Sequence, residues 1–202
     1  MLYLITNRKL ANNNDFYKII DEAIIGGISA IILREKDLSY AELLTIAKKV
    51  KKVIGSRDVN LIINSNLEVA KEVEAYGFHL CFEKFIGTKL SFKGIIGVSV
   101  HSLYQAIEAQ KQGADYLLLG HIFQTDCKKG LPPRGLELIK TIKKNVTIPI
   151  IALGGIKPEN ILVVMESGAD GAAVMSTIMQ AEDPCIITKQ YVDKMMRCVD
   201  SI

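Results

Sequence analysis

Short apolar segments alternate with longer amphipathic segments along the whole chain, and this alternation constrains the fold more than any other feature. The apolar segments are nearly continuous runs of Val, Ile and Leu, the pattern of parallel strands that are covered on both faces. We expect strands at residues 2–6, 30–33, 60–64, 77–81, 95–100, 115–120, 148–155 and 171–176.

The segments between these strands have the apolar spacing and the end signals of helices. We expect helices at residues 14–27, 39–55, 66–77, 102–113, 135–146 and 157–168. Several begin at Ser, Asn or Asp, whose side chains cap helix N-termini, and stop at Gly, which ends helices readily.

Roughly eight strand-plus-helix units with no break in composition predict one α/β domain over residues 1–202, a (β/α)₈ TIM barrel. The alternative is a doubly wound open sheet. That fold usually carries a glycine-rich phosphate loop after its first strand, and "LYLITNRKL" at residues 2–10 has none. The barrel is therefore the predicted fold.

Charge and cysteine usage narrow the class of protein. The net charge is +3, with Lys and Arg scattered among Asp and Glu, so the chain shows no basic stripe and we expect no nucleic-acid partner. No apolar run approaches the ~20 residues of a membrane span, so we expect no membrane association. The four cysteines have neither CxxC nor zinc spacing, and no signal peptide is recognisable; a cytoplasmic location with reduced thiols is expected.

Polar side chains gather where the predicted strands end. Active sites of such barrels lie at these positions, at the start of the loops that follow the strands. The seventh and eighth strands end in glycines and a serine whose backbone N–H groups could bind phosphate, namely Gly154, Gly155, Met175 and Ser176. Alternatively, the two glycines only permit a tight turn.

Two cations follow the second strand. Arg34 and Lys36 alternate, so both are expected to face the mouth of the barrel, with ion pairs to Glu35 or Asp37 as the alternative. Asn64 and Ser99 end the third and fifth strands in the same way and are candidate substrate contacts.

The three histidines have different expected roles. His79 lies inside a strand and is expected to be an internal, hydrogen-bonded residue. His101 either lines the site or caps the next helix together with Ser102. His121 ends an apolar strand directly before a loop, and a reference pKa near ~6.5 suits proton transfer, although a structural role is the alternative. In that loop Cys127 has no identifiable partner base, so we do not expect a nucleophile there.

Motifs along nearly the whole chain resemble the thiamine-phosphate-synthase superfamily of barrels. They are "LREK", "LIIN", "GVSVHSL", "GADYLLLGHIFQT", "KKG", "RGLELI", "IPIIALGGI" and "GADGAAVMS". The resemblance implies one of two enzymes. The synthase joins a pyrimidine diphosphate to a thiazole phosphate, whereas the TenI-type thiazole tautomerase shifts a proton on a carboxythiazole phosphate to make the ring aromatic.

The metal ligands separate the two enzymes, and so does the loop "GHIFQTDCKKG" at residues 120–130, which resembles the tautomerase version. The resemblance implies that the synthase binds Mg²⁺ through two aspartates, one after the third strand and one after the fourth. This chain has Ser65 and Lys84 there, with Glu83 as a nearby single carboxylate. We therefore expect no metal and no cofactor, with Mg²⁺ only if the chain is a synthase.

The predicted function is thus the tautomerase, an isomerase in which His121 is the acid/base catalyst. The resemblance implies phosphate contacts from Gly155, Met175 and Ser176 and ligand contacts from Arg34, Ser99 and Thr125. Lys36 and Lys128 match pyrophosphate-binding lysines of the synthase, which is the alternative. A regulatory barrel that binds thiamine phosphates without turnover is a further alternative. The expected partner is a thiazole phosphate or thiamine phosphate, and a homodimer is left open.

Overall fold

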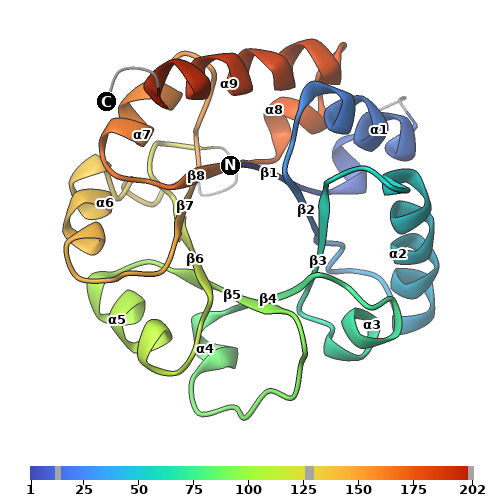
Figure 1. Ribbon diagram of the computed structural model, residues 1–202, viewed down its shortest axis with the longest axis horizontal. Helices are drawn as coiled ribbons and strands as arrows, with labels where there is room; N and C mark the ends of the chain where they lie inside the picture. Colours follow the sequence, from blue (N-terminus) through green and yellow to red (C-terminus); the bar gives the residue numbers. More distant parts are fainter. Residues whose placement is uncertain (12–14, 126–129, 200–202) are drawn as a thin grey trace.

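Eight parallel strands close into a barrel in the order β1 to β8, and β8 pairs with β1 (Figure 1). The computed structural model describes residues 1–11, 15–125 and 130–199. The predicted TIM barrel is confirmed, and the open-sheet alternative is wrong. The strands are β1 (Leu2–Ile5), β2 (Ala30–Leu33), β3 (Asn60–Asn64), β4 (Gly77–Cys81), β5 (Ile95–Val100), β6 (Tyr116–Gly120), β7 (Ile150–Leu153) and β8 (Gly171–Val174).

Helices form a ring outside the strands (Figure 1). They are the 3₁₀ turn η1 (Arg8–Leu10), α1 (Phe16–Gly26), α2 (Tyr40–Ile54), α3 (Leu67–Glu72), α4 (Phe82–Phe85), α5 (Leu103–Lys111), α6 (Leu136–Lys143), α7 (Ile161–Glu166), α8 (Ser176–Met179) and α9 (Pro184–Val199). The sequence did not predict α4 or α9. Helix α9 packs against α1 and α7, so it covers the seam between the first and last units of the barrel.

Several of the end signals read from the sequence are those that the structure uses. Ser39 and Glu42 form a reciprocal capping box at the start of α2, and Gly27 ends α1 in the left-handed conformation. Helix α3 is shorter than predicted. It ends at Glu72, after which Glu74 turns the chain with φ 48° toward β4.

None of the helices in the described ranges is long and apolar enough to cross a membrane.

Apolar side chains fill two layers, one inside the barrel and one between the strands and the helices. The inner layer is Tyr3, Ile5, Ala30, Ile32, Ile62, Tyr116, Leu118, Ile151 and Ala173. Because strand side chains alternate, residues two further along from an inward residue also face inward. Arg34 follows Ile32 in this way, Asn64 follows Ile62, and both lie at the carboxyl end of the barrel.

Candidate active site

Arg34 is a half-buried cation at the mouth of the barrel. Its backbone N–H donates to Thr6 Oγ1 at 3.0 Å, which fixes the residue just past the end of β2. Its charge contributes to the lowered pKa of His79, so the guanidinium acts on the barrel interior. No carboxylate of the described residues lies within ion-pairing distance of Arg34, and its charge is available for an anionic ligand.

The two carboxylates that were the alternative ion-pair partners of Arg34, Glu35 and Asp37, bind other residues. Glu35 is buried and accepts a hydrogen bond from Thr6 Oγ1 at 2.7 Å. It also forms an ion pair with Arg8 at 3.0 Å. Arg8 also binds Asp37, and this contact lowers the pKa of the Asp37 carboxyl. These contacts tie the loop after β1 to the loop after β2 and hold the backbone that carries Arg34. Lys36, between the two acids, is exposed.

A second polar group lies inside the barrel. His79 Nδ1 is 2.9 Å from the Tyr116 hydroxyl, and His79 Nε2 is 2.7 Å from Ser99 Oγ. The internal, hydrogen-bonded role predicted for His79 is confirmed. The Asn64 amide adds a hydrogen bond to the His79 carbonyl at 3.2 Å. Sequence reasoning missed Tyr116, whose signal was a tyrosine within an otherwise aliphatic strand.

The burial of His79 has a measurable consequence for stability. Burial, followed by the charge of Arg34, lowers the pKa of His79 from 6.5 to about 3. Below pH 6.5 the unfolded chain therefore gains a proton on this imidazole while the folded chain does not, so stability falls as pH falls. We expect His79 alone to lower the free energy of unfolding by roughly 2 kcal/mol between about pH 6.5 and about pH 5.

Urea unfolding of the wild type and of His79→Gln across this pH window measures the effect. The variant is expected to lose this part of the pH dependence, whatever its absolute stability. If the free energy of unfolding depended on pH equally in the two proteins, His79 would not stay neutral in the folded state.

His121 lies at the start of the loop after β6 and is buried, with 5% of its surface exposed. Its Nε2 is 3.3 Å from the Leu131 carbonyl, and its own carbonyl accepts from Arg134 N–H at 2.9 Å. The structure therefore ties both its ring and its backbone to the far end of this loop. Cys127 and Lys128 lie outside the described residues, whereas Thr125, just before them, is half-buried.

His101 is the remaining histidine. Its Nδ1 is 2.5 Å from the Gly120 carbonyl, and its backbone N–H donates to Gln105 Oε1 at 2.7 Å. Ser102, not His101, caps α5. The contacts of His101 join the ends of β5 and β6.

The predicted phosphate residues come together at the ends of β7 and β8, which are neighbouring strands. Gly154 and Gly155 have φ 103° and 64°, a left-handed conformation that favours glycine. A Cβ on Gly154 would lie 2.4 Å from His121 Cβ, so the β7 turn passes directly against the end of β6. Met175 and Ser176 follow β8, and the first N–H groups of α8 start there.

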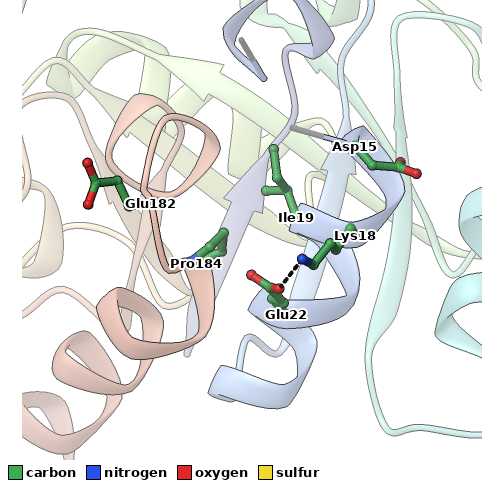
Figure 2. A pocket seen from close by; sticks show the side chains of 6 residues that line it. All are labelled: Asp15, Lys18, Ile19, Glu22, Glu182 and Pro184. Carbon is green, nitrogen blue, oxygen red and sulfur yellow. Dashed lines mark ion pairs between the residues drawn. The ribbon is translucent and has the colours of Figure 1, made fainter. Parts of the chain in front are cut away.

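The cavities outside the barrel mouth are poor substrate sites. One of about 40 Å³ lies between α1 and the start of α9 (Figure 2). Its lining includes the Lys18–Glu22 ion pair, and it is far below the roughly 300 Å³ at which ligand pockets begin. Another of about 210 Å³ opens at the opposite, amino end of the strands, where its two cations, Lys51 and Arg57, are already paired with acids.

The family model described as thiamine monophosphate synthase matches residues 2–178 of this chain. The chain belongs to the thiamine monophosphate synthase family. A curated thiamine-phosphate synthase from Clostridium tetani is 40% identical over 190 residues, which cover 90% of this chain and 89% of the relative. The synthase from Clostridium acetobutylicum is also 40% identical, over 185 residues, 90% of this chain and 88% of the relative.

A solved structure of the same kind is similar over almost the whole barrel. The thiamine phosphate pyrophosphorylase of Pyrococcus furiosus is 35% identical, with a TM-score of 0.85 over 98% of this chain and 96% of that chain. The superfamily resemblance read from the sequence motifs is thereby confirmed.

The prediction that this family member is a tautomerase is wrong. Relatives at 40% identity over nine-tenths of the chain are named thiamine-phosphate synthases, which favours the transferase that was the alternative. The prediction gave more weight to Ser65 and Lys84 than to the agreement of the whole barrel. The acid/base role of His121 belonged to the tautomerase reaction and is withdrawn with it.

The magnesium site that the family implies does not fit the residues of this chain. The end of β3 provides Asn64, Ser65 and Asn66, and the loop after β4 provides one carboxylate, Glu83, beside Lys84. Mg²⁺ in proteins is usually held by one or two carboxylates together with substrate phosphates and water, and here the neighbour of the only carboxylate is a cation. Within residues 1–11, 15–125 and 130–199, no three His, Cys, Asp or Glu side chains lie close enough together to hold a metal ion.

Proposed function

We propose that this chain is a thiamine-phosphate synthase, a transferase that joins a pyrimidine diphosphate to a thiazole phosphate. The observation that carries the proposal is the 40% identity over 90% of the chain with curated synthases. The expected partners are therefore small phosphorylated molecules that bind at the carboxyl ends of the strands.

The reaction makes one bond and breaks one. The thiazole ring nitrogen donates its electron pair to the methylene carbon of the pyrimidine. The bond from that carbon to the diphosphate oxygen breaks, and its electrons leave with pyrophosphate. No proton has to move, so the reaction requires no acid/base residue at position 121. The demand on the protein is to hold two anions and to stabilise the charge that develops on the leaving group.

The residues of this chain divide that work between two regions. Arg34, with Lys36 beside it, supplies positive charge where the diphosphate leaves, and Lys128 is proposed as a further contact there. The backbone of Gly154 and Gly155, together with Met175 and Ser176, holds the phosphate of the thiazole. Asn64, Ser99 and Thr125 are proposed contacts with the rings and the diphosphate between the two regions.

His121 has a positioning role in this proposal. Its contacts to Leu131 and Arg134 hold the end of the β6 loop against the turn that contains Gly154. The support is geometric, because the ring is buried and its Nε2 is directed at a carbonyl of the loop. A cytoplasmic location, with Cys81 and Cys185 as free thiols, completes the proposal.

Growth complementation tests the function in a cell. A bacterium that lacks its own thiamine-phosphate synthase is expected to grow without thiamine when it expresses this chain. Growth on added thiamine phosphate is the control for the host. A well-expressed, folded protein that fails to restore growth would contradict the proposal.

A further inference from the structure

A continuous hydrogen-bonded chain runs from the middle of the barrel to its mouth through Tyr116, His79 and Ser99. These residues lie on β6, β4 and β5, three neighbouring strands (Figure 1). The links are 2.9 Å from the Tyr116 hydroxyl to His79 Nδ1 and 2.7 Å from His79 Nε2 to Ser99 Oγ. Tyr116 and His79 are buried, whereas Ser99 is half-buried, so only the last member can meet a ligand.

The rings of Tyr116 and His79 are held in fixed positions. Gly97 makes room for Tyr116, since a Cβ there would lie 2.0 Å from the end of the phenol ring. Tyr3 packs edge-on against the same ring at 5.8 Å, and the His79 ring lies beside it at 5.6 Å. The rest of the inner layer is aliphatic, and aliphatic side chains would fill this space without a buried hydrogen-bonding requirement.

The hydrogen bonds of this series all donate in one direction, from Tyr116 through His79 to Ser99. This direction follows from the hydrogens that each group carries. His79 is neutral in the folded protein because of its burial, so its ring carries a single N–H. The buried Tyr116 hydroxyl keeps its hydrogen, because burial raises the pKa of the phenol, and that hydrogen needs an acceptor. The acceptor that the described structure offers is His79 Nδ1. The histidine hydrogen must then be on Nε2, where it is donated to Ser99 Oγ.

We propose that Tyr116 and His79 are positioning residues that make Ser99 a hydrogen-bond donor toward the mouth of the barrel. Because Ser99 Oγ accepts from His79, its own hydrogen is left to bind an acceptor on the ligand. Arg34 also acts on this region, so the acceptor is an anionic oxygen, which we assign to the diphosphate of the pyrimidine substrate. Only that assignment rests on the proposed synthase function.

The tautomer can be read directly. In protein labelled with ¹⁵N at histidine, long-range ¹H–¹⁵N spectra distinguish a ring protonated at Nδ1 from one protonated at Nε2, and His79→Gln assigns the signal. We expect His79 to remain neutral with its hydrogen on Nε2 from about pH 8 to about pH 5. A hydrogen on Nδ1, or a charged ring at about pH 6, would overturn the proposal.

Pyrophosphate binding, measured by calorimetry without turnover, tests the consequence for the ligand. Tyr116→Phe removes one hydroxyl and is expected to weaken pyrophosphate binding about fivefold, the size of one net hydrogen bond. Tyr3→Phe is the matched control, because Tyr3 lies in the same inner layer and its hydroxyl is 3.9 Å from the Met1 sulfur. The affinity of this variant for pyrophosphate should stay within about twofold of the wild type.

The effect must pass through Ser99. In a Ser99→Ala background, Tyr116→Phe is expected to cause no further loss, because the group that it orients is gone. Equal losses in both backgrounds would reduce Tyr116 to a general structural role. Absence of pyrophosphate binding in the wild type would overturn the diphosphate assignment. A different result separates the two proposals. If the wild type binds pyrophosphate and the Tyr116→Phe effect depends on Ser99, but no thiamine phosphate forms, only the proposed synthase function is contradicted.

Discussion

Arg34→Met is expected to lower kcat/KM for thiamine phosphate formation by about 100-fold, the cost of leaving a bound anion without its partner cation. Methionine keeps much of the length and apolar surface of the arginine stem, so the barrel should fold normally. The loss comes from the guanidinium, which the structure presents at the barrel mouth without a carboxylate partner among the described residues.

The matched control is Arg57→Met at the opposite end of the barrel. Arg57 pairs with Asp21 at 2.7 Å and lies beside the amino end of β3, remote from the strand ends that carry the site. Its replacement also removes one positive charge, and we expect the steady-state rates to remain within about twofold of the wild type. Equal losses in the two variants would mean that overall charge, not a contact at position 34, explains the effect.

Gly154→Ala is expected to lower the free energy of unfolding by roughly 4 kcal/mol. Roughly 1–3 kcal/mol comes from a side chain forced to φ 103°, and roughly 1–3 kcal/mol from overpacking. The new Cβ would lie 2.4 Å from the Cβ of His121 and 2.7 Å from its Cα. Because the obstacle includes backbone, a side-chain rotation cannot relieve it.

Gly113→Ala separates the two causes. Gly113 has φ 90°, similar to Gly154, but nothing lies within 4 Å of an added Cβ. We expect this variant to lose only the strain contribution, about 1 kcal/mol. Urea denaturation curves of both variants give the comparison. If the two losses were equal, the close contact between the β7 turn and His121 would have no energetic weight.

The sequence predicted the barrel well because each buried strand is a nearly continuous apolar run. Strands β2, β3, β4 and β5 have the predicted bounds. The predicted seventh strand, 148–155, was too long, because Gly154 and Gly155 continue the apolar pattern while turning the backbone. Helix α9 was missed because it follows no strand.

The candidate site was predicted only in part. Strand ends could be located from the pattern, which brought Arg34, Ser99 and the β7 glycines to one end of the barrel. The contact between Tyr116 and His79 could not be predicted, because it depends on the register of three strands. Gly97 was a usable signal, since glycine inside a strand often marks a close approach of another group.

The error about activity has a physical explanation. Ser65 and Lys84 are unsuited to a magnesium site, and the prediction let that site, together with the loop at residues 120–130, decide between two enzymes. Holding two anions and stabilising a leaving group can be spread over many contacts, whereas a metal cage depends on a few carboxylates. Similarity over the whole barrel therefore carried information that two strand-end residues did not.

The most direct measurement is product formation by the purified wild-type protein with the pyrimidine diphosphate, the thiazole phosphate and Mg²⁺. We predict equal amounts of thiamine phosphate and pyrophosphate over many turnovers, with nothing formed by heat-denatured protein. Folded protein that binds both substrates and releases neither product would contradict the assignment as a synthase.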